Sequence, residues 1–198
     1  HMTWEEHLAL LERHHTSGGD DGLSYNVVFR LLNAADYGVP QSRHRVIIVG
    51  FRSDLNASWS FPLATHSQDA LLYAKWISGD YWEEHRMKKP AETPLSAQQL
   101  RAIRRSVEET ETPLLRWHTV RDAIGDLPDP ANLKAAARYN NHEFRDGARV
   151  YAGHSGSKLD EPSKTIKAGA HGVPGGENMV VLDDGSVRYY TVRESARI

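Results

Sequence analysis

The sequence predicts an α/β protein, and three observations support this class. Residues 25–32 are dense in β-branched and aromatic side chains, which favours a buried strand. Residues 45–51 form a second, nearly continuous apolar run, typical of sheets covered on both faces. Residues 3–15 begin with a capping box at Thr3 and continue as a helical apolar stripe. A helix followed by strand, loop and strand is part of an α/β layer.

The loop between the two predicted strands holds one amide and two guanidinium groups. Gly38 and Pro40 punctuate the loop. Gln41, Arg43 and Arg45 are spaced by two, so a strand beginning at Gln41 would point all three side chains the same way. Such a face suits phosphate oxygens or a base edge. Two other interpretations fit the spacing: an edge strand with solvated charges, or arginines paired with an internal carboxylate.

Three helices are expected in the middle of the chain. Ser67 is an N-cap for a helix through about residue 78, which Gly79 interrupts. A capping box at Ser96 opens a second helix, whose Arg104–Glu108 and Arg105–Glu109 pairs predict a self-paired, solvated face. Residues 119–125 form a short helix.

The last third predicts short strands and a final capping box. Residues 163–168 are expected to form a short strand, and residues 179–182 and 187–190 flank a hairpin turn at 183–186. A capping box at Thr191 starts a helix only a few residues before Ile198. One turn of helix is unstable alone, so we expect the chain to be cut from something larger.

Composition narrows the function. The 198 residues include 24 Lys and Arg, 26 Asp and Glu and no cysteine, with a formal net charge of −2. This balance does not favour binding nucleic acid by bulk charge, although residues 25–54 hold four Arg against two Asp. Without cysteine the chain has no disulfide, zinc–thiolate site or cysteine nucleophile of its own. No apolar run approaches a membrane span, so we expect a cytoplasmic protein that makes no membrane contact.

Three stretches together resemble the DNA cytosine-5 methyltransferases. Residues 32–50 resemble that family's Gln-x-Arg-x-Arg motif, usually numbered eight, and residues 188–198 resemble the start of motif nine. Residues 161–169 resemble an element near the end of the target-recognition domain, which the family places between these motifs. The resemblance covers essentially the whole chain. It implies a bacterial protein, of the kind found in restriction-modification, that acts on double-stranded DNA.

The resemblance also implies a domain division. Residues 3–54 would be part of the sheet of a Rossmann-like methyltransferase catalytic domain, and residues 55–187 a small mixed α+β target-recognition domain. Residues 188–198 would be the truncated start of motif nine. The implied function is the DNA target-recognition portion of an enzyme that transfers methyl from S-adenosylmethionine to cytosine C5.

The sequence lacks the family's catalytic and methyl-donor motifs. The family uses a Pro-Cys dipeptide, a Glu-Asn-Val tripeptide and a Gly-rich turn for the methyl donor, and this sequence contains none of them. The family reaction needs a thiolate, so this chain alone is expected to be inactive. We therefore expect no cofactor or metal on this chain. Its expected partners are DNA and the missing catalytic half, where S-adenosylmethionine would bind.

Site residues follow from the resemblance. Arg45 would contact the flipped cytosine or its flanking backbone, Arg43 would help in the same cleft, and Gln41 would order the loop. Base reading would fall to a Gly-rich loop whose glycines allow close approach to a groove. The loop candidates are Lys167, His171, Gly172, Gly175, Gly176, Glu177 and Asn178. An ordinary tight loop with solvated tips is the alternative. Asn141, His142 and His154 are candidates for a second recognition loop.

Other functions fit parts of this pattern. The chain could be a stand-alone DNA-binding specificity module, or the non-catalytic subunit of a split methyltransferase. A regulatory pseudo-subunit that binds another protein is a third alternative. The short final helix favours a piece of a methyltransferase, because a free-standing module is expected to finish its elements.

Overall fold

The computed structural model describes residues 24–57, 59–166 and 178–198, which form two compact units. The first unit contains residues 24–31 and Val46–Pro62, and the second contains Leu32–Arg45 and Leu63–Ile198. The helix predicted at residues 3–15 lies outside the described residues.

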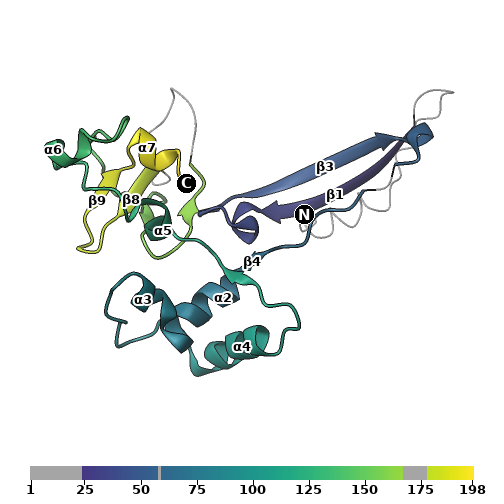
Figure 1. Cartoon of the computed structure of the whole chain (residues 1–198), viewed down its shortest axis with the longest axis horizontal. Helices are drawn as coiled ribbons and strands as arrows, with labels where there is room; N and C mark the ends of the chain where they lie inside the picture. Colours follow the sequence, from purple (N-terminus) through teal and green to yellow (C-terminus); the bar gives the residue numbers. More distant parts are fainter. Residues whose placement is uncertain (1–23, 58, 167–177) are drawn as a thin grey trace. The chain divides into compact units, whose positions relative to one another are not determined.

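A two-stranded sheet dominates the first unit. Strands β1 (Tyr25–Asn33) and β3 (His44–Arg52) pair and run in opposite directions (Figure 1), which confirms both predicted strands. A short 3-10 turn, η2 (Ser53–Leu55), follows β3. Phe61 is buried, with the Trp59 ring edge-on at 4.4 Å and the Arg30 guanidinium 5.3 Å from its centroid.

The expected burial of this sheet on both faces is wrong for the described residues. Val27 is 45% exposed, Leu31 42% and Ile48 67%. Within the part of the chain that the structure describes, the sheet consists of these two strands alone, and a two-stranded sheet is too small to bury its apolar faces by itself. The apolar sequence of these strands is therefore open to packing against further protein.

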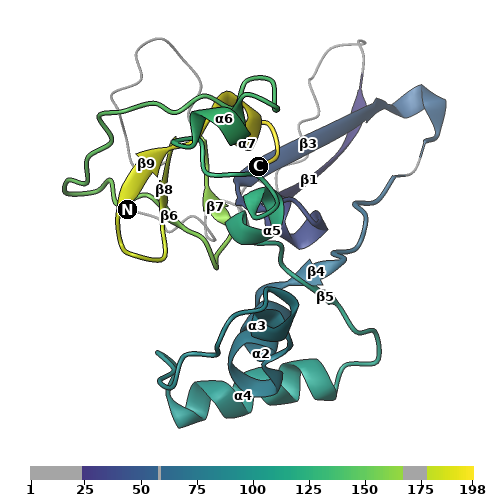
Figure 2. The same ribbon diagram turned by 60° about the vertical axis from the view of Figure 1, so that its left-hand side comes forward.

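In the second unit, the chain forms short helices between the two strands of a parallel pair. Strand β4 (His66–Ser67) pairs with β5 (Leu115–Arg116), as Figure 2 shows. The intervening elements are α2 (Gln68–Tyr73), the π-helix η3 (Ala74–Ser78), α3 (Asp80–Glu84) and α4 (Ala97–Glu108). Leu71, Tyr81 and Trp82 form their core.

The predicted caps of these helices are confirmed. The Ser67 hydroxyl accepts from the Ala70 amide, and Ser96 forms a complete capping box with Gln99. Arg104 lies 3.9 Å from Glu108 and Arg105 3.8 Å from Glu109, all with exposed side chains. The self-paired face of α4 is therefore as predicted.

The rest of the second unit is a small sheet with three short helices. Strands β6 (Ser157–Lys158) and β8 (Met179–Val181) are parallel, and β9 (Val187–Tyr189) is antiparallel to β8 (Figure 2). The hairpin predicted at residues 183–186 is confirmed, with Gly185 in the left-handed region at φ 81°. The helices are α5 (Val120–Ile124), α6 (Leu133–Ala136) and α7 (Val192–Ser195).

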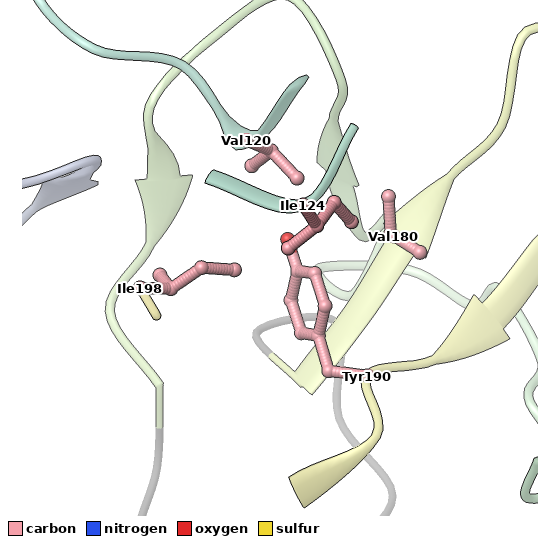
Figure 3. Packing of buried hydrophobic residues seen from close by; sticks show 5 residues of the cluster. All are labelled: Val120, Ile124, Val180, Tyr190 and Ile198. Carbon is pink, nitrogen blue, oxygen red and sulfur yellow. The ribbon is translucent and has the colours of Figure 1, made fainter. Parts of the chain in front are cut away.

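A core joins α5, the sheet and the last residues of the chain. Figure 3 shows the five buried side chains gathered around the Tyr190 ring. They are Val120, Ile124, Val180, Tyr190 and Ile198. Burial raises the pKa of the Tyr190 hydroxyl. Among the described residues, no helix is long and apolar enough to cross a membrane.

Candidate functional site

The loop with the predicted site residues is joined to a distant segment. It contains the 3-10 turn η1 (Ala34–Tyr37) and strand β2 (Gln41–Ser42), which pairs in parallel with β7 (Ser163–Lys164). The Ser163 amide donates to the Pro40 carbonyl at 2.9 Å, and the Thr165 hydroxyl donates to the Ser42 carbonyl at 3.1 Å. Of the predicted strand 163–168, residues 165–166 are not in β7, and residues 167–168 lie outside the described residues.

Gln41 is buried and connects this loop to the last residue of the chain. Its side chain is among the buried polar groups, and Nε2 donates to the Ile198 carbonyl oxygen at 3.4 Å. A buried amide with a hydrogen-bond partner holds its backbone in place, because breaking the bond would leave a polar group unsatisfied. Gln41 is thus suited to ordering the loop.

The Asn33 side chain holds the backbone of Arg43 in place, a role that the sequence patterns did not indicate. The Asn33 carbonyl oxygen Oδ1 accepts from the Arg43 amide at 2.9 Å and from the Ala35 amide at 3.4 Å. The Arg43 carbonyl accepts from the Ala34 amide at 3.0 Å. Asn33 is 5% exposed. Asn is a frequent cap immediately before a helical turn, so the position of Asn33 before η1 was the sequence signal that could have indicated this role.

Gly38 closes the loop at a position that admits no side chain. Its φ of 86° is left-handed, and a Cβ there would lie 2.8 Å from the His66 ring atom Cε1. Burial and the neighbouring charges of His118 and Arg116 lower the pKa of His66. A neutral ring is therefore favoured against this turn.

The two arginines of the loop have no carboxylate partner among the described residues. Arg43 is partly buried, while Arg45 is exposed and its Nη1 donates to the His44 carbonyl at 2.6 Å. Among the described residues, neither Arg43 nor Arg45 is therefore paired with an internal carboxylate. Their guanidinium groups retain donors for an anionic ligand.

The expectation of one strand presenting all three side chains is wrong. Gln41 lies in β2, Arg43 lies between the strands and Arg45 lies in β3. Exposure rises along the loop from buried Gln41 to exposed Arg45. The break arises because the Arg43 backbone bonds to Asn33 and Ala34 instead of continuing the strand ladder.

A tethered turn at Asp160 precedes β7. Asp160 Oδ1 accepts from the Tyr81 hydroxyl at 2.7 Å and from Arg121 Nε at 2.6 Å. Its backbone carbonyl accepts from Lys75 Nζ at 2.8 Å. Burial alone would raise the pKa of Asp160, but the bonds from Arg121 and Tyr81 outweigh it and lower the value. Burial lowers the pKa of Lys75 and raises that of Tyr81.

A cavity of about 590 Å³ adjoins this turn and reaches Ser42 in the loop. Its lining includes Trp76, Trp82, Trp117, Lys75, Lys158 and Lys164. Lys158 lies 3.4 Å from Glu161, whereas Lys164 Nζ donates to the Ser155 hydroxyl at 2.8 Å. Asp160 and Glu161 line the same cavity, so lysines from three elements lie beside two carboxylates near the loop of Arg43.

The capping box predicted at Thr191 is confirmed, and its glutamate also holds an arginine. The Thr191 amide donates to Glu194 Oε2 at 2.9 Å, and the Glu194 amide donates to the Thr191 hydroxyl at 3.1 Å. Arg188 binds both carboxylate oxygens of Glu194 at 2.7 Å. The two side chains are 11% and 1% exposed. This pair orders the stretch that ends at Ile198.

The assignment of His142 to a recognition loop is wrong, because its ring is 1% exposed. Nε2 donates to the Pro128 carbonyl at 2.7 Å, and Nδ1 is hydrogen-bonded to the Thr191 hydroxyl at 3.0 Å. His142 therefore joins two segments of the core. Asn141 is exposed with φ 62°, and the His154 ring lies 5.0 Å from the Tyr151 ring.

Most candidates in the Gly-rich loop lie outside the described residues. These are Lys167, His171, Gly172, Gly175, Gly176 and Glu177. Asn178 is described: it is partly buried, and its carbonyl accepts from the Tyr190 amide at 3.0 Å. Among the described residues, no cluster of three or more His, Asp or Glu side chains could hold a metal ion.

Comparison with known proteins gives consistent matches. The family model for C-5 cytosine-specific DNA methylase matches residues 19–198. The chain is 31% identical over 199 residues to the type II methyltransferase M.MthTI of Methanothermobacter thermautotrophicus. That match covers 89% of this chain and 46% of that protein.

Two bacterial proteins are also similar. The type II methyltransferase M.BsuRI of Bacillus subtilis is 29% identical over 187 residues, covering 88% of this chain and 31% of that protein. M.BspRI of Lysinibacillus sphaericus is 56% identical over 45 residues, which cover 23% of this chain and 11% of that protein. The chain spans less than half the length of these curated relatives.

Proposed function

Because the chain belongs to the C-5 cytosine-specific DNA methylase family, we propose that it is the DNA target-recognition portion of a DNA cytosine-5 methyltransferase. The complete enzyme would transfer methyl from S-adenosylmethionine to cytosine C5 within a specific DNA sequence. The observation that carries this proposal is the anchored loop of Arg43 and Arg45, whose guanidinium groups have no carboxylate partner among the described residues. The type II relatives support a restriction-modification setting.

The two arginines would form one wall of the cleft that receives DNA. Arg45 would bind the flipped cytosine or its flanking phosphate, because a guanidinium is a permanent cation with several donors. Arg43 would act in the same cleft, held through its backbone by Asn33. Gln41 would order the loop through the Ile198 carbonyl, and would thereby link it to the residues that resemble motif nine.

The chemistry would be divided between this chain and another segment. Covalent attack on cytosine needs a thiolate, and this chain has no cysteine. The relatives are also more than twice as long as the region they share with it. The missing segment would supply the thiolate and the methyl-donor site, so no step involving the donor is assigned to residues of this chain. This chain would bind and orient DNA.

The chain would divide into three parts of the methyltransferase. Residues 3–54 would complete the sheet of the Rossmann-like catalytic domain, and the exposed apolar side chains of β1 and β3 would pack in that sheet. Residues 55–187 would be the target-recognition domain, and residues 188–198 the start of motif nine. The exposure of Ile48 and Leu31 favours this division over a stand-alone DNA-binding module, which would leave them in water.

Reconstitution tests the proposal. The purified chain is mixed with a complementary polypeptide that carries the Pro-Cys segment and the donor site, and transfer of labelled methyl to duplex DNA is measured. We expect neither transfer nor binding of S-adenosylmethionine by this chain alone, and transfer by the mixture. Methyl transfer by the chain alone would overturn the proposal. Specific DNA binding without reconstitution of transfer would support the stand-alone module instead.

A further inference from the structure

We propose that three residues clamp the turn η1 against strands β4 and β5 and thereby position the loop that contains Arg45. These positioning residues are Asp36, His66 and Trp117, and together they are called the turn clamp. The clamp would set where Arg45 meets the target base without touching the base itself. This inference rests on the proposed function and adds residues that act on its site through the loop.

The Trp117 side chain ties the turn to a buried core. Its Nε1 donates to Asp36 Oδ1 at 2.9 Å, across 81 positions of the chain. The Trp117 ring packs against the core of Leu71, Tyr81 and Trp82. A hydrogen bond to a carboxylate is stronger than one between neutral groups, and here the packed core holds the ring that donates it. The turn is therefore attached to a well-packed part of the second unit.

Backbone hydrogen bonds join the same turn to β4 and β5. The Thr65 amide donates to the Asp36 carbonyl at 2.9 Å. The Leu115 amide, at the start of β5, donates in turn to the Thr65 carbonyl at 3.0 Å. Asp36 is therefore held twice, through its side chain by Trp117 and through its backbone by Thr65.

The His66 ring fills the space beside the turn. His66 is 8% exposed, and the Thr65 hydroxyl lies 2.8 Å from its Nδ1. The ring lies so close to Gly38 that a Cβ on this glycine would be 2.8 Å from the ring atom Cε1. The ring thus packs directly on the backbone that leads from η1 into the loop.

The clamped turn is connected directly to the arginines. The amide of Ala34, the first residue of η1, donates to the Arg43 carbonyl at 3.0 Å, and Arg45 follows in β3. His66 and Trp117 belong to the proposed target-recognition domain, whereas η1 belongs to the proposed catalytic part. The recognition domain would thus fix the place of the arginines. A displacement of about 1 Å within an active site can cost about 100-fold in rate.

The clamp is tested by Trp117→Phe in the reconstituted enzyme, because this change removes the Nε1 donor and keeps an aromatic ring in the core. We expect kcat for methyl transfer to fall about five- to tenfold, while KM for DNA changes by less than about twofold. In an Arg45→Ala background, Trp117→Phe should cost less than about twofold more, because two changes that act through one group are not additive.

Two further variants test the other members of the clamp. Asp36→Ala removes the acceptor of the same bond and should lower kcat as Trp117→Phe does. Asp36→Asn keeps an amide oxygen as acceptor and should restore most of the wild-type kcat. His66→Ala empties the space beside Gly38 and should also lower kcat. Wild-type kcat in His66→Ala would remove this residue from the clamp.

The matched control is Tyr73→Phe, which also removes one donor to a carboxylate. The Tyr73 hydroxyl donates to Glu108 Oε1 at 2.8 Å, a bond between α2 and α4. This control should keep the wild-type kcat. An equal loss of kcat in the control would overturn the clamp, because the effect would then be on the whole fold. A loss in Trp117→Phe that multiplies in full with that of Arg45→Ala would overturn it as well.

The two proposals fail in different ways. If the wild-type mixture methylates DNA and both Trp117→Phe and Asp36→Ala keep its kcat, the clamp is wrong while the proposed function stands. If the wild-type mixture does not methylate DNA, the proposed function fails and the clamp fails with it.

Discussion

Arg188 and Arg45 have the same guanidinium group in opposite surroundings. Arg188 is 11% exposed and binds both oxygens of Glu194, which is 1% exposed. Arg45 is exposed and, among the described residues, its side chain donates only to the carbonyl of its neighbour, His44. A buried, doubly bonded arginine holds the fold together, whereas an exposed arginine on an anchored backbone is available to a ligand. The environment, and not the residue type, therefore separates the arginines that hold the fold from the arginine that we propose binds DNA.

Arg116 and Arg121 resemble Arg188 in that each is paired with a carboxylate. Arg116 binds both carboxylate oxygens of Asp122 at 2.8 and 2.9 Å, and Arg121 binds Asp160 and Asp183. These carboxylates raise the pKa of both guanidinium groups against the opposing effect of burial. Each pair connects segments that are distant in the chain or fixes a helix cap. Their removal should change stability, and removal of Arg45 should change only function.

The largest predicted effect is on the Arg188–Glu194 pair. Glu194→Ala leaves a buried guanidinium without a partner and removes a helix cap, so unfolding free energy should fall by about 3–5 kcal/mol. Urea unfolding followed by circular dichroism measures it. Glu194→Gln is the matched control, because its amide oxygen can still cap Thr191, and its loss should be smaller. A loss below about 1 kcal/mol for Glu194→Ala would contradict the structural role of the pair.

Acid should weaken the Arg116–Asp122 pair. Burial alone would raise the pKa of Asp122, but hydrogen bonds from Arg116 and Thr119 lower it from 3.8 to about 2. A depressed carboxyl pKa stabilises the fold above pH 3.8 and loses that contribution as pH falls toward 2. The shift corresponds to about 2 kcal/mol. Asp122→Asn should flatten unfolding free energy across this window, and an unchanged pH profile would refute the assignment.

A smaller effect is expected at Asn33, which holds the backbone of Arg43. Asn33→Ala removes the acceptor for the Arg43 and Ala35 amides, so unfolding free energy should fall by about 1–2 kcal/mol. Asn33→Asp, which keeps an acceptor, should retain most of this energy. Thermal unfolding of the three chains measures it. Identical midpoints for Asn33→Ala and wild type would show that Asn33 does not anchor the loop.

The smallest effect is expected on the surface of α4. Arg104→Ala breaks an exposed pair whose side chains are 60% and 48% exposed, so unfolding free energy should change by at most about 0.5 kcal/mol. Urea unfolding in low and high salt measures it. A loss as large as that of Glu194→Ala would remove the distinction between buried and exposed ion pairs.

Local features of the fold were predictable from the sequence. The Ser96 and Thr191 capping boxes and the hairpin at residues 183–186 depend on side chains within a few positions of one another. The self-paired arginines of α4 have the same short range. The family resemblance was also correct, and it rested on two motifs in the expected order.

Long-range contacts were not predictable. Tyr81 and Asp160 are 79 positions apart, and Gln41 and Ile198 are 157 apart, so no periodicity connects them. His142 was assigned to a loop because a polar segment surrounds it, yet both ring nitrogens are bonded in the core. The exposure of β1 and β3 was missed because apolar strands predict burial without indicating what covers them. The DNA roles of Gln41, Arg43 and Arg45 stay predictions.

The most direct test of the central claim is Arg45→Ala in the reconstituted enzyme. We predict that kcat/KM for methyl transfer falls by about 10- to 100-fold, which corresponds to the loss of one or two charge-assisted hydrogen bonds. The unfolding midpoint should equal that of wild type, because Arg45 bonds only to its neighbour within the described residues. Reconstitution at the full wild-type rate would contradict the assignment of Arg45 to the target cleft.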